Sequence, residues 1–148
     1  MRPIAAGQLV LRVLLGSVFL VSGFEKLSSP AQNFAAVIEK YQILHGPAVM
    51  LFAQAMPWVE LIFGALLVLG LWTRVSLLAL WGMNTLFIGV LSSALLRKLQ
   101  IDECGCFGES LSLSPPKMLA VDIGLWFLFL FFFLSNRRIK APSLDDRL

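Results

Sequence analysis

The sequence predicts an all-α integral membrane protein, a four-helix bundle that forms a single domain over residues 1–148. Of the 148 residues, 58% are hydrophobic and only 14% are charged, which leaves too little polar surface for a water-soluble domain of this size. The apolar residues also gather into four runs, each about long enough to cross a hydrocarbon core of roughly 30 Å. We therefore expect the lipid bilayer to surround most of the chain.

The composition argues against several other classes of protein. A formal net charge of +3 is modest, whereas a nucleic-acid surface needs a dense basic face, so we expect no nucleic-acid partner. The chain has no Gly-rich phosphate loop, and its single histidine argues against a dedicated metal site. We accordingly expect neither a resident metal nor a covalently bound cofactor.

The first predicted span covers residues 9–27 and ends in Glu25 and Lys26, which we interpret as an ion pair at the membrane edge. A signal peptide is the alternative, but Arg12 lies late for one and no small-residue cleavage site follows, so we expect a retained helix. The span carries small residues that allow a second helix to approach closely. They are Gly16, Ser17, Ser22 and Gly23.

A short amphipathic helix is predicted at residues 30–42, between the first and second spans. Pro30 suits the first position of a helix, and the apolar residues that follow recur at helical spacing on one face. These are Phe34, Val37, Ile38 and Tyr41. Because the segment is too short to cross the bilayer, we expect it to lie in the membrane interface.

Three further spans complete the predicted bundle, at residues 49–72, 75–96 and 117–135. The span at residues 49–72, the second of the four, is entered through His45-Gly46-Pro47. Pro57 inside it should kink the helix or open a gap in its hydrogen bonding. A tight turn before Arg74 joins the second span to the third.

Orientation follows from the distribution of Lys and Arg in short flanks, which favours the cytoplasmic side. A weak majority of these residues lies on the side of the two termini, which we therefore place in the cytoplasm, with residues 97–116 outside. That side holds Arg2, Arg12, Arg74, Arg137, Arg138, Lys140 and Arg147, and the other holds Lys26, Lys40, Arg97, Lys98 and Lys117.

Both cysteines of the chain, Cys104 and Cys106, lie in the polar loop at residues 97–116 with Gly105 between them. A disulfide between them requires a sharp bend, which glycine permits, and so small a ring should be strained. Strained disulfides are readily reduced and tend to be exchange sites, so we predict a redox-active pair. Incidental thiols or a minor structural disulfide remain one alternative. Metal binding, with His45 as the only available histidine, is another.

Several ionisable residues are candidate proton-handling or quinone-contacting groups beneath the cysteines, because charged groups within a membrane are costly and commonly functional. We expect Glu60 near the middle of the membrane and most of the others nearer the outer side. The alternative for Glu60 is a structural hydrogen bond to Asn84 or to backbone freed by Pro57. The candidates are Glu25, Lys26, His45, Glu60 and Asp122.

Three groups of residues resemble the DoxX-like superfamily, and within it the methylamine-utilisation MauE branch. They are Arg12 to Leu27 with Gly16, Ser22 and Gly23; Pro57-Trp58-Val59-Glu60-Leu61 with Gly64, Gly70-Leu71 and Thr73-Arg74; and Cys104-Gly105-Cys106-Phe107-Gly108, the most specific of the three. The resemblance implies a four-helix membrane bundle that works beside an extracytoplasmic thioredoxin-like protein. It also implies disulfide handling during the maturation of exported redox enzymes, and the wider superfamily includes quinone-linked sulfur oxidation.

The leading hypothesis is thus a thiol–disulfide oxidoreductase of the bacterial inner membrane. Cys104 and Cys106 would exchange a disulfide with a thioredoxin-like partner, and a quinone is the candidate electron acceptor. The alternative is a non-catalytic assembly factor or scaffold for a secreted partner, alone or as part of a homo- or hetero-oligomer. A small-solute transporter is suggested only by Pro57 and Glu60 in one span, and the shortness of the bundle argues against it unless the bundle oligomerises.

Overall fold

A computed structural model describes the backbone of residues 3–99 and 114–138 and the side chains of residues 7–99 and 114–135. Every secondary-structure element in these ranges is a helix, which confirms the all-α prediction. The helices are α1 (Pro3–Ser28), α2 (Ala31–Lys40), α3 (Pro47–Leu69), α4 (Thr73–Leu96) and α5 (Pro115–Arg138). All but α2 are long and apolar enough to cross a membrane, as expected for a multi-pass membrane protein.

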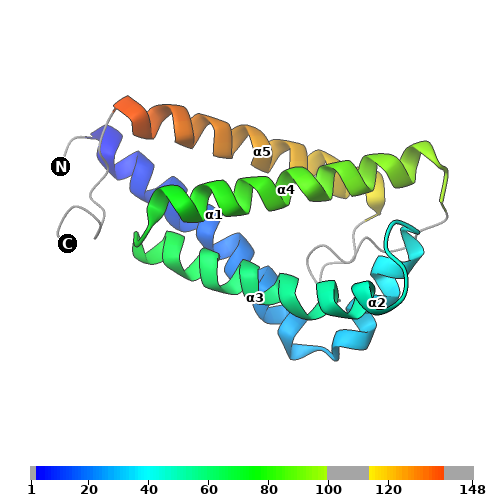
Figure 1. The fold of residues 1–148 in the computed structure, drawn as a ribbon. Helices are drawn as coiled ribbons and strands as arrows, with labels where there is room; N and C mark the ends of the chain where they lie inside the picture. Colours follow the sequence, from blue (N-terminus) through cyan, green and yellow to red (C-terminus); the bar gives the residue numbers. More distant parts are fainter. Residues whose placement is uncertain (1–2, 100–113, 139–148) are drawn as a thin grey trace.

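The four long helices lie side by side with alternating directions (Figure 1). The start of α1 and the end of α5 meet at one end of the bundle, where Gln8 Nε2 donates a hydrogen bond to Ser135 Oγ at 2.8 Å. The turn between α3 and α4 lies at that same end. The opposite end holds α2, the end of α4 and the start of α5, and we call it the α2 end (Figure 1).

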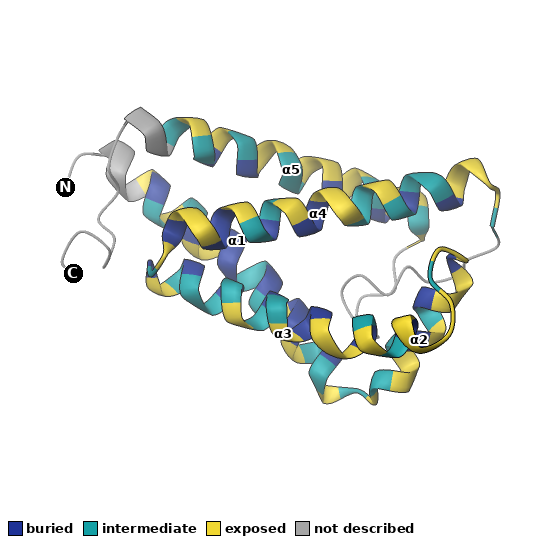
Figure 2. Cartoon of the chain, viewed as in Figure 1, coloured by how far each residue is buried: buried dark blue, intermediate teal, exposed yellow. Residues whose placement is uncertain are grey.

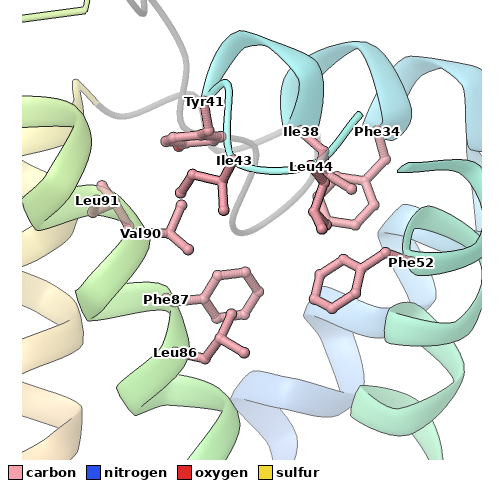
Figure 3. Close-up of a pocket in the computed structure, with 10 residues that line it drawn as sticks. All are labelled: Phe34, Ile38, Tyr41, Ile43, Leu44, Phe52, Leu86, Phe87, Val90 and Leu91. Carbon is pink, nitrogen blue, oxygen red and sulfur yellow. The ribbon is translucent and has the colours of Figure 1, made fainter. Parts of the chain in front are cut away.

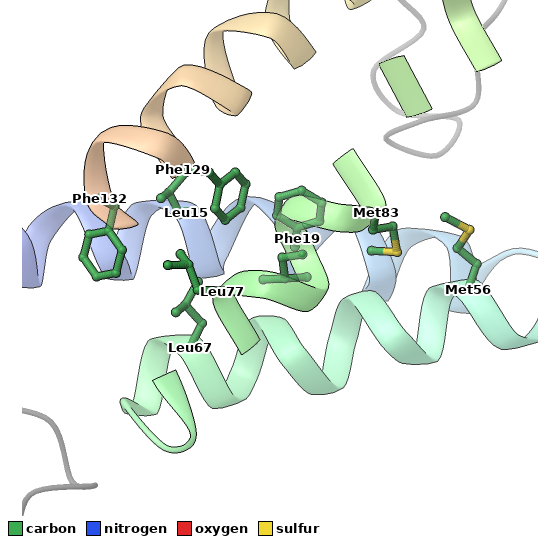
Figure 4. Close-up of a cluster of buried hydrophobic side chains, with 9 residues drawn as sticks. Leu15, Phe19, Met56, Leu67, Leu77, Met83, Phe129 and Phe132 are labelled. Atoms are coloured by element: carbon green, nitrogen blue, oxygen red, sulfur yellow. The ribbon is translucent and has the colours of Figure 1, made fainter. Parts of the chain in front are cut away.

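The core consists of large apolar side chains contributed by all four long helices (Figure 4). The rings of Phe19 and Phe129 lie 5.7 Å apart between centroids and join α1 to α5. The outer sides of the helices are also apolar and largely exposed (Figure 2). Phe131, for example, is 63% exposed although Phe132 beside it is buried. An exposed apolar surface on every long helix is the pattern that lipid contact requires.

Glycines bring α1 and α3 into direct backbone contact, as the small residues of the first span predicted. A Cβ atom added to Gly64 would lie 2.9 Å from the Leu20 nitrogen and 3.0 Å from the Gly16 oxygen. One added to Gly23 would lie 2.7 Å from the Pro57 oxygen. Since larger side chains would push the backbones apart, these glycines set the distance between the two helices. Helix α3 continues unbroken through Pro57.

The α3–α4 turn is closed by Gly70, which adopts the left-handed conformation (φ 77°) favourable to glycine. Its N–H and that of Leu71 both donate to the Leu66 carbonyl. The guanidinium of Arg12 packs against this residue, since a Cβ on Gly70 would lie 2.6 Å from one of its nitrogens. A cation at this position meets the partial negative charge of the α3 C-terminus. Arg12 is thus a structural residue of this end of the bundle.

Helix α2 has the amphipathic character predicted for it. Ala35, Ile38 and the adjoining Tyr41 are buried. Ala35 and Ile38 pack in one cluster with Val49 and Ala53 of α3. The apolar face of α2 is therefore covered by protein, and the predicted position of this helix in the membrane interface stays a prediction.

Replacing Gly64 with Ala should destabilise the bundle, because the added methyl group meets backbone atoms of α1 that cannot move independently. We expect a loss of about 1–3 kcal/mol in the free energy of unfolding, measured by denaturant titration in detergent micelles. Gly89→Ala is the matched control, because a Cβ there meets nothing within 4 Å and alanine favours helix. Equal stability of the two variants would contradict the glycine-mediated contact.

Candidate functional site

The two predicted redox residues, Cys104 and Cys106, lie outside the described residues, so their pairing stays a prediction. The structure does define where the segment that carries them is attached. That segment follows Leu99, just after α4, and precedes Ser114, just before α5. Both attachment points lie at the α2 end of the bundle (Figure 1).

A salt bridge is buried between α1 and α3. Lys26 Nζ lies 2.6 Å from Glu60 Oε1, and each side chain is only 1% exposed. Ser22 Oγ donates to Glu60 Oε2 at 2.9 Å, and Lys26 Nζ also lies 3.2 Å from Ser22 Oγ. Both oxygens of the carboxylate are therefore hydrogen-bonded, which is what a buried charge requires.

The local sequence explains how these three side chains meet. Ser22 and Lys26 are one helical turn apart and so share a face of α1. Gly23, between them, lets α3 approach so closely that its added Cβ would lie 3.0 Å from the Glu60 Cβ. The close glycine contact thus delivers the Glu60 carboxylate to the Ser22–Lys26 face.

The predicted ion pair between Glu25 and Lys26 is wrong, because Lys26 pairs with Glu60. Neighbouring residues on a helix point about 100° apart, and the half-buried Glu25 does not share the α3-facing side of Lys26. The sequence also placed Glu60 nearer the middle of the membrane than Lys26. For their charged groups this expectation is wrong, because the two groups are in direct contact.

The remaining candidates do not gather around this salt bridge in one cluster. Asp122 is buried on α5, and its main-chain oxygen accepts a 2.9 Å hydrogen bond from Asn84 Nδ2 of α4. The structural alternative is confirmed in that Glu60 hydrogen-bonds to another helix, but its partners lie on α1 and do not include Asn84. His45 is exposed in the turn between α2 and α3. Of the five ionisable candidates, the structure brings together Lys26 and Glu60.

A cavity of about 240 Å³ opens at the α2 end between α2, α3 and α4 (Figure 3). Three phenylalanine rings form much of its wall, and among its described lining side chains only Tyr41 carries a polar atom. The amphipathic pattern of α2 predicted that its residues in this wall face other apolar groups. No pattern in the sequence singled out the residues that α4 contributes to the wall. The lining residues are Phe34, Ile38, Tyr41, Ile43, Leu44, Phe52, Leu86, Phe87, Val90 and Leu91.

The salt bridge and the cavity are neighbours. Lys26 Nζ lies 5.1 Å from the centroid of the Phe34 ring and 5.1 Å from that of Phe87. A cation at this distance attracts the face of an aromatic ring, and the attraction is stronger where water is excluded. Lys26 therefore joins α1 to two walls of the cavity, one on α2 and one on α4.

The cavity also reaches the attachment point of the cysteine segment. Tyr41 and Val90, two of its lining residues, pack in one cluster with Ala94 and Leu99. Leu99 is the last described residue before the cysteine segment. The salt bridge, the cavity and the start of this segment therefore follow one another through direct contacts.

The model of the family described as methylamine utilisation protein MauE matches residues 4–135, a range that includes the cysteine pair. Comparison with curated proteins and with solved structures gives no match.

Replacing Glu60 with Gln should destabilise the protein strongly, because it leaves the Lys26 charge buried without its counter-ion. We expect a loss of about 3–5 kcal/mol in the free energy of unfolding, measured in detergent micelles. Adding Lys26→Met to Glu60→Gln removes the unpaired charge and should recover part of that loss. Glu25→Gln is the control for the loss of an acidic side chain, and equal effects of E60Q and E25Q would contradict this role of the salt bridge.

Proposed function

The chain belongs to the MauE family, and from this premise we propose that it is a membrane thiol–disulfide oxidoreductase. In this proposal Cys104 and Cys106 exchange a disulfide with an extracytoplasmic thioredoxin-like protein during the maturation of exported redox proteins. The membrane in question is the bacterial plasma membrane, with both termini in the cytoplasm.

One observation carries the proposal: the cysteine segment is attached where the bundle has an apolar cavity next to a buried salt bridge. At the opposite end, by contrast, the described chain forms the tight α3–α4 turn and the Gln8–Ser135 contact between α1 and α5. The segment that carries the cysteines is therefore attached at the same end of the bundle as a space that suits an apolar reactant. Thiol exchange requires access, and a loop at the end of a membrane bundle supplies it.

The exchange step conserves atoms and electrons. A thiolate of the partner attacks one sulfur of the Cys104–Cys106 disulfide, forming a mixed disulfide and releasing the other cysteine as a thiolate. The partner's second thiolate then attacks the mixed disulfide. The partner leaves with a new disulfide, and Cys104 and Cys106 are left reduced by two electrons. The same steps in reverse reduce the partner.

A further acceptor is needed for turnover in the oxidising direction, because the chain contains only one pair of cysteines and cannot relay electrons through a second disulfide. A membrane quinone fits this role by its location and stoichiometry. One quinone takes up the two electrons and two protons of the dithiol and becomes a quinol, while the Cys104–Cys106 disulfide forms again.

Replacing either cysteine with Ser should trap the partner, because the remaining cysteine can form a mixed disulfide that has no internal resolving thiol. Non-reducing electrophoresis followed by mass spectrometry should detect this covalent complex, and dithiothreitol should dissolve it. The control is the double variant Cys104→Ser, Cys106→Ser. A scaffold would instead co-purify with its partner in every variant without a covalent link, and that result would overturn the proposed exchange.

Orientation can be tested with a membrane-impermeant maleimide applied to intact cells after mild reduction. We expect Cys104 and Cys106 to be labelled without permeabilisation. For comparison, Trp72→Cys in the cysteine-free variant places one thiol on an exposed residue of the α3–α4 turn, at the other end of the bundle. That thiol should react only after permeabilisation, and the reverse pattern would place the cysteines in the cytoplasm.

A further inference from the structure

We propose that the cavity walled by Phe34, Phe52 and Phe87 binds the ring of a membrane quinone, whose hydrocarbon tail passes between α3 and α4 into the bilayer. The inference rests on the proposed function, since it locates the electron acceptor of the cysteine pair. It draws on the size of the cavity, its lining, its connection to the lipid-facing surface and its position.

The size of the cavity suits a head group of one or two rings. Its volume is about 240 Å³, whereas an engineered apolar cavity of about 150 Å³ already accommodates benzene. A long isoprenoid tail does not fit into the remaining space. A quinone in this cavity must therefore extend its tail elsewhere.

The lining suits a flat, weakly polar ring. Phe34, Phe52 and Phe87 come from α2, α3 and α4, so aromatic side chains face the cavity from three helices (Figure 3). Aromatic rings pack favourably against one another in offset or edge-to-face arrangements. The apolar lining also disfavours a charged or strongly hydrated ligand, because its desolvation would not be compensated.

A second hollow provides the path for a tail. It measures about 260 Å³, lies between α3 and α4, and shares Phe52 and Leu86 with the cavity. Leu86 is 45% exposed, and a Cβ added to Gly82 of this hollow meets nothing within 4 Å. The hollow therefore leads from the cavity to the outer, lipid-facing surface of the two helices.

The two sides of the cavity then have different roles. Tyr41 lies at one side in Figure 3 and Leu86 at the opposite side. Tyr41 belongs to the cluster that includes Leu99, at the start of the cysteine segment, whereas Leu86 leads to the α3–α4 hollow. A ring in the cavity is thus directed towards the attachment point of the cysteine segment at Leu99, with its tail directed towards lipid. Lys26 serves as a positioning residue that holds the Phe34 and Phe87 rings.

The test measures binding of a decyl-substituted benzoquinone to the purified full-length protein in lipid nanodiscs. Leu86→Trp should obstruct the junction of the cavity and the hollow, and we expect it to weaken binding by about tenfold or more, equivalent to about 1.4 kcal/mol. Leu78→Trp is the matched control, an identical substitution at an exposed α4 leucine outside both hollows. Phe87→Leu provides a second variant, which removes a ring but keeps an apolar side chain.

The outcomes separate this inference from the proposed function. Equal binding by the Leu86→Trp, Phe87→Leu and Leu78→Trp variants would overturn the site, and so would equally strong competition by decylbenzene, which shares the tail but lacks the quinone. Oxidation of reduced Cys104 and Cys106 by the probe is measured separately in the wild-type protein. If binding follows the predicted pattern but the cysteines stay reduced, the quinone site stands and the proposed electron transfer fails.

Discussion

A salt bridge buried among apolar helices persists only where its two charges meet within hydrogen-bonding distance, and Lys26–Glu60 imposes this requirement on α1 and α3. The glycine contacts between these helices make the distance possible, and Ser22 satisfies the second carboxylate oxygen. The register of α1 against α3 is therefore fixed by polar groups as well as by packing. A shift of one helical turn, about 5.4 Å, would separate the charges within the core.

The same salt bridge connects the helix pair to the cavity. Lys26 faces the rings of Phe34 and Phe87, so its position affects both α2 and α4. In this way a polar interaction within the α1–α3 contact supports the wall of the neighbouring apolar cavity between α2, α3 and α4. The cavity reaches the attachment point of the cysteine segment through Tyr41 and Leu99. The α2 end of the bundle is thus organised by contacts that begin at Glu60.

Local sequence patterns were sufficient for the helices and insufficient for the site. Hydropathy predicted the four long helices, and helical spacing predicted the buried face of α2, because both depend on residues close in the chain. The partner of Lys26 lies 34 positions away, and adjacency in sequence wrongly favoured Glu25. The cavity combines residues from α2, α3 and α4, so no single segment carries its signature. The glycines were the useful long-range signal, since small residues in the first span predicted the close approach that makes the salt bridge possible.

The proposed thiol exchange requires a disulfide that forms readily and is readily reduced. The reduction potential of the Cys104–Cys106 couple measures this property directly, by equilibrating purified protein in nanodiscs with thiol buffers of graded potential and counting alkylated cysteines by mass spectrometry. We expect a two-electron transition above about −300 mV, the range of exchangeable rather than structural disulfides. A potential well below that value, or two cysteines that never form a disulfide with each other, would contradict the assignment of a redox-active pair.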